Sequence, residues 1–305
     1  MDIKVFSESE LPLALAALRS VCDSPRGRQL REVLAEIHGV ALAVDTAAAL
    51  DEVSAAIVRP HARLRLVQLA IVAALVDGMP TPPKVRAAHE LAGALAVREP
   101  GLAVLRQLAA GRRRVARFLV FRRIAARVFG DAWRRGGVAG LRRLIAPLWL
   151  GGGSDPALAW RFRQLGLLPG GTLGHTLWAH CTERQFAFPG ERKGIPEQMV
   201  FHDIGHLLTG FSTEAPGEIQ QGAFQAGFVR RDGFMFLLFV ILQFHLGIKV
   251  TPVAPGAVGL FDVPVVMRAL ARGAATRDLS EDWSLWSDCA RPLSELRAAY
   301  GVPPA

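Results

Sequence analysis

Two histidines and one glutamate in residues 201–218 constrain the local fold more strongly than any other feature of this chain. The segment reads FHDIGHLLTGFSTEAPGE, with His202 and His206 four residues apart and Glu218 twelve residues further on. Residues four apart on a helix lie about 40° apart around its axis, so both imidazoles lean the same way. The glycine, serine, threonine and proline residues before Glu218 indicate a turn and a new helix. The three side chains are therefore predicted to meet between two helices.

Such a set of side chains is typical of a site for one divalent metal ion. Two imidazoles and one carboxylate that leave open positions fit either a catalytic zinc or a facial-triad iron, and the ligand types alone do not separate the two. Asp203, next to His202, is predicted to be a fourth metal ligand, an acceptor that orients an imidazole, or a catalytic general base. The alternative is that both histidines lie on a helix surface, or that one is buried and hydrogen-bonded to a carbonyl.

Helical patterns dominate the rest of the chain. Between residues 62 and 76, Leu64, Val67 and Ile71 recur at steps of three and four, and an Asp-Gly pair followed by prolines ends the pattern. Strand-like runs such as residues 248–253 are too short to build a sheet. We therefore expect an all-α fold, in which a helical N-terminal module is followed by a helical metal-binding domain.

Length and composition predict two domains with a sizeable core. The chain has 305 residues, of which 51% are hydrophobic. The clearest linker is GGGSDP at residues 151–156. The predicted organisation is a helical N-terminal module at 1–110, basic amphipathic connecting helices at 111–150, and the metal-binding domain at 151–305.

The connecting segment carries much of the chain's net charge of +9. Residues 111–143 contain eleven arginines and one acid, Asp131, with apolar side chains interleaved. The default interpretation is an ordinary helix whose apolar stripe packs on the core while arginine faces water. A basic amphipathic helix can also lie on an anionic membrane. Nucleic acid is the least favoured partner, because no recognised nucleic-acid motif accompanies the charge.

Cysteine usage and hydropathy predict a cytoplasmic protein. Cys22, Cys181 and Cys289 are far apart and odd in number, which favours reduced thiols. The first ten residues lack the basic and apolar regions of a secretory signal. The most apolar stretch, residues 234–248, is shorter than the ~18 residues that span a bilayer and is predicted to be a buried core helix. We expect a cytoplasmic location, with peripheral attachment to the inner face of the membrane if the basic helix binds lipid.

The six other histidines are weaker candidates for a site. His175 and His180 are five apart and share a helical face poorly, but a glycine-rich turn before them could bring either near the metal. His245, on an apolar helix, is predicted to be a core histidine with a hydrogen-bond partner. The remaining three are predicted to be surface or capped residues: His38, His61 and His89.

Residues 157–305 resemble the coenzyme Q biosynthesis protein 4 family, whose hallmark is HDxxH, eleven residues and then Glu. His202, Asp203, His206 and Glu218 match that hallmark, and the stretch PGGTLG at 169–174 is similar to the family's P-x-G-T-x-G element. Downstream, ELR at 295–297 and GVP at 301–303 are similar to its closing helix. The N-terminal part is similar to tellurite-resistance TerB-like helical modules through the Asp77-Gly78 turn.

The chain departs from the family just before the histidines. The family usually carries arginines and a tyrosine there, whereas this chain has PEQMVF at 196–201. Arg184 or Arg192 could supply the missing contact to a substrate carboxylate, although an arginine in a loop is more often solvated.

The resemblance implies ubiquinone biosynthesis: a metal-dependent loss of the carboxylate from a polyprenylated hydroxybenzoate ring, coupled to hydroxylation at the same carbon. It also implies a polyprenylated aromatic lipid as substrate, other quinone-biosynthesis enzymes as partners, and a homodimer as a possible assembly. The phenylalanines of residues 224–244 would either line a groove for the tail or, as the favoured alternative, form plain core.

Two other functions remain open from the residues alone. A metal-dependent hydrolase could be of the HD type, which needs a further upstream histidine and a downstream aspartate, or a zinc peptidase, which needs glutamate where this chain has Asp203. A non-catalytic scaffold could bind lipid quinone precursors or partner enzymes and use the metal only for structure.

Overall fold

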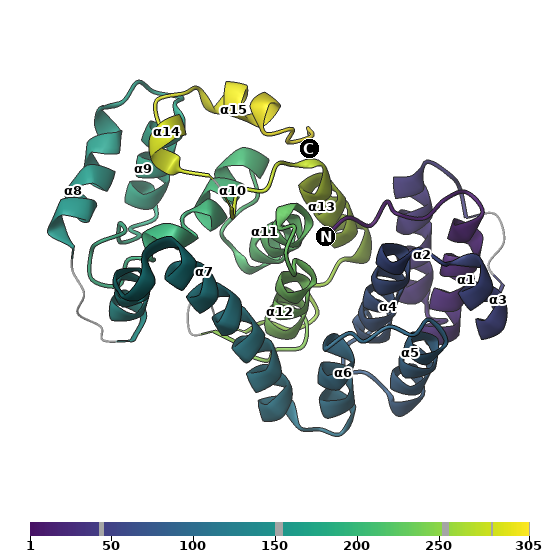
Figure 1. Ribbon diagram of the computed structural model, residues 1–305. Coiled ribbons are helices and arrows are strands. Elements are labelled where there is room, and N and C mark those ends of the chain that lie inside the picture. The colour runs from purple at the N-terminus through teal and green to yellow at the C-terminus, as the bar shows by residue number, and fades with distance from the viewer. Residues whose placement is uncertain (43–45, 150–154, 252–255, 282, 305) are drawn as a thin grey trace. The chain divides into compact units, whose positions relative to one another are not determined.

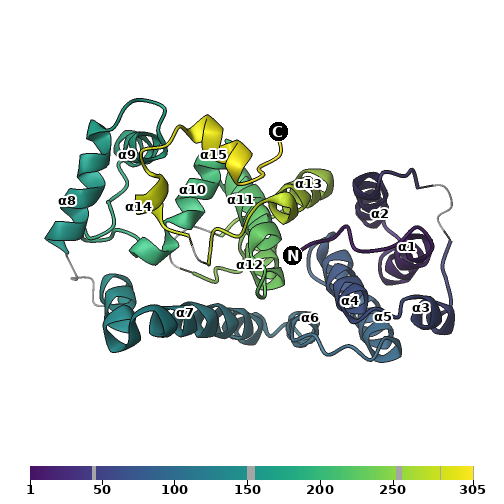
Figure 2. The same ribbon diagram turned by 45° about the horizontal axis from the view of Figure 1, so that its top comes forward.

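The computed structural model describes residues 1–42, 46–149, 155–251, 256–281 and 283–304, and within these ranges helices joined by loops make up the chain (Figures 1 and 2). Within them there is no strand, only isolated bridges between Thr172 and Pro292 and between Leu246 and Val258. The predicted all-α fold is confirmed.

The elements are α1 (Glu10–Val21), α2 (Pro25–His38), α3 (Leu50–Ala56), α4 (Pro60–Leu75), α5 (Pro82–Ala94), α6 (Gly101–Ala109), α7 (Arg113–Trp149), α8 (Pro156–Gln164), η1 (Leu165–Leu167), α9 (Leu173–Glu183), η2 (Glu197–Met199), α10 (Phe201–Thr209), α11 (Ala215–Phe228), α12 (Phe234–Phe244), α13 (Val263–Ala275), α14 (Leu285–Asp288) and α15 (Leu293–Ala299).

Local sequence explains where several helices begin and end. The side chain of Ser24 accepts a hydrogen bond from the Gly27 amide and caps α2 at its N-terminus. The same helix ends at Gly39, whose φ of 83° is a left-handed conformation that favours glycine. Helix α4 begins with Pro60 in its first turn and stops just before the Asp-Gly turn that the sequence marked.

Contacts divide the chain into two compact units, each assembled from segments far apart in sequence. The first comprises residues 1–122 and 214–274, and the second residues 123–213 and 275–305. The predicted linker at 151–156 falls mostly on residues outside the described ranges. The division into 1–110, 111–150 and 151–305 stays a prediction.

The first unit contains α1 to α6 together with α11, α12 and α13. Helix α12 is apolar except for Gln243 and almost fully buried, as expected for the stretch that is too short to span a bilayer. It packs along α11 and also contacts α4. The approach of α11 to α12 is close because a Cβ at Gly222 would stand only 2.1 Å from Cγ1 of Val240. A glycine is therefore required at this crossing.

Four of the six phenylalanines considered for a tail groove are core residues of this unit. Phe224 and Phe228 are both 0% exposed, with their rings edge to face at 5.4 Å, and Phe234 and Phe244 are also buried. The interpretation of these four as plain core is confirmed. Phe236 and Phe239 are half-buried.

The second unit is organised around α9, which packs against α10, α14 and α15. Near the C-terminus, Tyr300 is buried; its hydroxyl donates to Asp288 and accepts from the indole N–H of Trp283. Burial and the Asp288 hydrogen bond raise the pKa of Tyr300 well above its usual range.

Three further expectations can be compared with the structure. All three cysteines are free thiols, as predicted. Among the described residues, no helix is both long and apolar enough to cross a membrane. His245 is buried, and its Nε2 donates to the carbonyl of Leu75 at 3.1 Å, which confirms a core histidine with a hydrogen-bond partner. Burial lowers the pKa of its imidazole.

Candidate metal centre

Helix α10 carries both candidate histidine ligands. It follows directly on the short η2 turn and ends at Gly210, whose φ of 79° reverses the chain into the next loop. His206 is 3% exposed and His202 is half-buried. The predicted helix–turn–helix is therefore present, because the left-handed glycine ends α10 and Pro216 lies in the first turn of α11.

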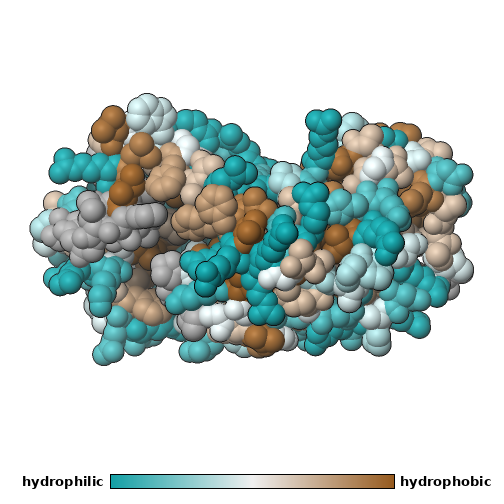
Figure 3. Space-filling view, turned by 90° about the horizontal axis from the view of Figure 1, so that it is seen from below, coloured by the Kyte–Doolittle hydropathy of each residue, from teal (hydrophilic) through white to brown (hydrophobic). Residues whose placement is uncertain are grey.

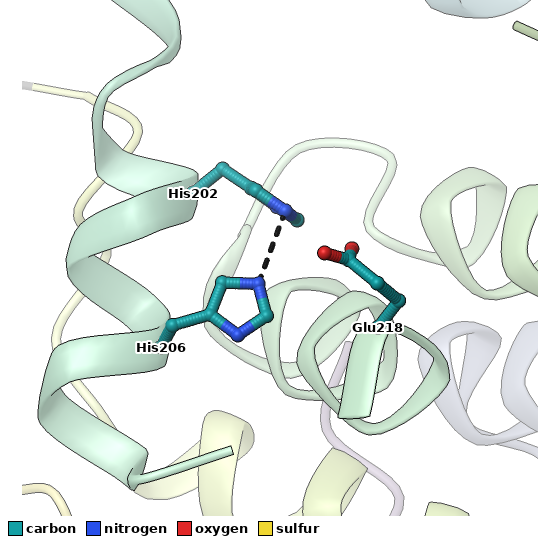
Figure 4. A group of neighbouring side chains, drawn as sticks. All are labelled: His202, His206 and Glu218. Atoms are coloured by element: carbon teal, nitrogen blue, oxygen red, sulfur yellow. Dashed lines mark hydrogen bonds between the residues drawn. The ribbon is translucent and has the colours of Figure 1, made fainter. Parts of the chain in front are cut away.

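Glu218 lies in that same first turn of α11, and its carboxylate points toward the histidines (Figure 4). One ligand atom from each of His202, His206 and Glu218 lies within 4.8 Å of the others. The two Nε2 atoms are 3.4 Å apart, and the rings meet nearly edge to face. Two nitrogens bound to one tetrahedral zinc at the usual bond length would stand about 3.3 Å apart. The spacing of the histidines fits a shared cation.

A backbone hydrogen bond sets the orientation of the His206 ring. The carbonyl oxygen of Phe211, 3.0 Å from Nδ1, can only accept, so Nδ1 carries the proton. In the neutral ring Nε2 is then the nitrogen with a lone pair, and it faces His202. Metal-binding histidines in proteins are commonly oriented in this way, by a carbonyl or carboxylate on the other ring nitrogen.

Asp203 does not belong to the group of ligand atoms that the structure brings together. It is half-buried, and its charge interacts with the thiol of Cys181 on α9. Burial, and then the negative charge of Asp203, raise the pKa of the Cys181 thiol to about 12. The role of Asp203 as ligand, orienting acceptor or general base stays a prediction.

The C-terminal end of α10 is held by the last helix. Arg297 of α15 donates from Nε to the carbonyl of Leu208 at 2.9 Å and from Nη2 to that of Leu207 at 3.0 Å. These carbonyls have no partner within the helix, and a cation at a helix C-terminus is favourable. Arg297 therefore fixes the helix that bears both histidines.

His180 is the nearest of the other histidines considered for the site. It is buried on α9, and its ring is stacked 6.5 Å from that of His206. His175 instead contacts Trp178 on its own helix. Arg184 is exposed and donates to Thr213, and Arg192 is exposed. The structure gives neither arginine a contact with the three candidate ligands.

A cavity of about 200 Å³ lies at the N-terminal end of α10. Its walls include Phe201, Phe162 and the indoles of Trp283 and Trp286, and Glu197 is the charged residue among the described lining residues. Glu197 accepts a hydrogen bond of 2.6 Å from the Trp286 indole. Glu197, five positions before His202, is thus an acid on a cavity wall.

Two contacts that hold the candidate site in place could not be predicted from the sequence. The Phe211 acceptor is a backbone carbonyl, which leaves no mark in the sequence. The sequence shows Arg297 only as part of a motif, because the helix whose carbonyls it binds lies about ninety residues earlier.

No family model matches the chain, and no curated protein matches it. A solved structure from Nostoc punctiforme PCC 73102, provisionally described as a ubiquinone biosynthesis protein, is similar over 80% of this chain and 98% of its own, with 17% identity and a TM-score of 0.33. Similarity at this level determines neither the fold nor the function. The structure defines an all-α protein with a candidate metal centre on two consecutive helices.

Proposed function

We propose that His202, His206 and Glu218 bind one divalent metal ion, zinc or iron, and that the protein is a metal-dependent enzyme of ubiquinone biosynthesis. The observation that carries the proposal is the convergence of these ligand atoms within 4.8 Å from two consecutive helices. The resemblance of the same residues to the HDxxH and Glu hallmark supports the proposed pathway and substrate, a polyprenylated hydroxybenzoate ring.

The proposed reaction exchanges the ring carboxylate for a hydroxyl group at the same carbon. Carbon dioxide leaves from the ring carboxylate, and dioxygen with two electrons from a donor and three protons supplies the hydroxyl group and one water. A bound cation would stabilise the negative charge that develops on the ring when carbon dioxide departs.

The residues of the chain contribute binding, orientation and proton control. His206 is fixed by Phe211, so its Nε2 is presented without rotation of the ring. Asp203 is proposed to act from beside the histidines, as an orienting acceptor or as the catalytic base. The acid Glu197 on the nearby cavity wall repels an anion. We therefore propose that the substrate carboxylate is held at the metal centre rather than in that cavity.

The test uses a strain that lacks the ubiquinone head-group decarboxylation step. Wild-type protein is expected to restore quinone, whereas Glu218→Gln is expected to leave the carboxylated prenyl precursor in the lipid extract, measured by mass spectrometry. Glu214→Gln is the matched control, because Glu214 is an exposed acid one turn earlier whose side chain makes no cap hydrogen bond. It is expected to restore quinone fully.

Other outcomes would assign one of the alternative functions. Full rescue by folded Glu218→Gln would contradict an enzymatic role and favour a scaffold that binds quinone precursors. Turnover of phosphomonoesters or peptides by purified, metal-loaded protein, without any effect on quinone, would favour a hydrolase.

A further inference from the structure

The first turns of α7 expose a large aromatic side chain where an ordinary amphipathic helix would bury it. Ala116 and Val120 are buried, at 0% and 2% exposed, whereas Phe118 is 59% exposed. On a helix Phe118 lies about 160° from both buried residues and so points away from the core. Trp133, further along the same helix, is 55% exposed. The default interpretation, in which the apolar side chains of this segment pack inward, is wrong at these two residues.

Exposed arginines surround Phe118. Arg114 and Arg122 lie four residues before and after it, which places them on the same side of the helix. We call this group, with the exposed residues around it, the α7 patch: Arg112, Arg113, Arg114, Val115, Arg117, Phe118 and Arg122. The sequence of the patch contains no acid. Figure 3 shows one face of the protein, on which apolar side chains lie exposed among hydrophilic ones.

Several other arginines of the same unit have a counter-charge, which the arginines of the patch lack. Arg19, Arg28, Arg59 and Arg268 each pair with a carboxylate. Within the described part of the chain, none of the five arginines of the patch forms an ion pair. The unpaired guanidinium groups favour contact with anions, and the exposed aromatic ring between them favours contact with an apolar phase. A partner of this surface must therefore offer both.

We propose that the α7 patch binds the surface of an anionic lipid bilayer. Arginine side chains reach lipid phosphates while their aliphatic stems lie along the acyl boundary, and a phenylalanine between them inserts below the headgroups. A nucleic-acid duplex satisfies only the charge because its bases are stacked inside, and no recognised nucleic-acid motif accompanies the arginines. A second copy of this basic surface would repel the first. The bilayer is the partner that satisfies both requirements, and the proposal is independent of the three candidate metal ligands.

The experiment measures sedimentation of the full-length protein with vesicles. About a third of the lipid is phosphatidylglycerol in one set, and the other set is neutral phosphatidylcholine. Binding to the anionic vesicles is expected, with release at about 0.5 M salt because the Debye length shortens. Arg114→Gln with Arg122→Gln is expected to weaken binding about 30-fold, since each arginine contributes about fivefold. Phe118→Ala is expected to weaken it about tenfold.

Matched controls separate the patch from general charge and hydrophobicity. Arg86→Gln with Arg98→Gln removes the same charge from exposed positions outside α7, and Leu167→Ala shortens an apolar side chain that is 80% exposed. Both are expected to leave vesicle binding unchanged. All substituted side chains are exposed, so folding is expected to be retained and is checked by circular dichroism.

Three results would overturn the proposal. The first is equal or absent binding to both vesicle types, and the second is an equal loss of binding in the control pair. The third is binding of duplex DNA, or a dimer that Phe118→Ala dissolves, in protein that does not bind anionic vesicles.

Discussion

The guanidinium of Arg297 donates to the carbonyl of Leu208 at 2.9 Å and so joins the last helix to the end of the helix that carries both candidate histidines. The contact satisfies carbonyls that helix α10 itself leaves without partners. It therefore connects the position of the metal ligands to a residue far away in sequence.

Replacing Arg297 with glutamine is expected to lower the free energy of unfolding by about 1 kcal/mol, because an exposed cation at a helix C-terminus contributes about that much. Metal affinity is expected to fall about tenfold, as when an outer partner of a ligand is lost. Urea unfolding and metal titration measure the two effects. Arg28→Gln, which removes an exposed arginine paired with Glu32, is the control and should change stability by less than about 0.5 kcal/mol. Equal effects in both variants would show that the Arg297 contact has no special role.

The crossing of α11 and α12 gives a second prediction. Gly222→Ala is expected to destabilise the protein by about 1–3 kcal/mol, because the new methyl group would meet Val240. Gly93→Ala, on α5 with nothing within 4 Å of the new methyl group, is expected to be neutral or stabilising by up to about 1 kcal/mol.

A double substitution tests the cause of that effect. Val240→Ala should make room for the new methyl group, so Gly222→Ala with Val240→Ala should be more stable than the sum of the two single changes, by about 1 kcal/mol or more. Strict additivity in denaturant unfolding would argue against a close approach at this position.

Because the pKa of the Cys181 thiol is raised, the free energy of unfolding is expected to fall at alkaline pH. Its pKa is raised from the ordinary 9.0 to about 12, so the folded state holds a proton that the unfolded state releases. This contribution to stability is complete below pH 9.0 and is lost as the pH rises toward about 12. The slope due to the thiol approaches about 1.4 kcal/mol per pH unit. Unfolding measured across this range should show a shallower slope for Cys181→Ala and for Cys181→Ser. Unchanged slopes in both variants would contradict the assignment.

A substitution of Asp203 distinguishes a role in catalysis from a role in metal binding. Asp203→Asn is expected to retain one metal per chain, because Asp203 lies outside the group of three ligand atoms. Quinone formation in the deficient strain is expected to fall strongly, since an amide can neither accept a proton nor hold the charge of a carboxylate. Loss of the metal in this variant would instead make Asp203 a ligand.

Residues close together in sequence account for what could be predicted of the fold and the site. Gly210 ends α10 and Pro216 lies in the first turn of α11, only a few residues later. The two helices and the turn between them could therefore be predicted from local sequence. Long-range packing could not, because nothing local shows that residues 214–274 join residues 1–122 in one unit. The same limit applies to Phe118, since a periodic pattern shows that a helix has apolar residues but not which of them meets the core.

Metal analysis of anaerobically purified protein tests the central claim most directly. The wild type and His61→Ala, which changes a histidine outside the group, are expected to carry one zinc or iron per chain. His202→Ala, His206→Ala and Glu218→Ala are expected to lose it, while remaining folded by circular dichroism. Retention of wild-type metal content by both histidine variants would contradict the account.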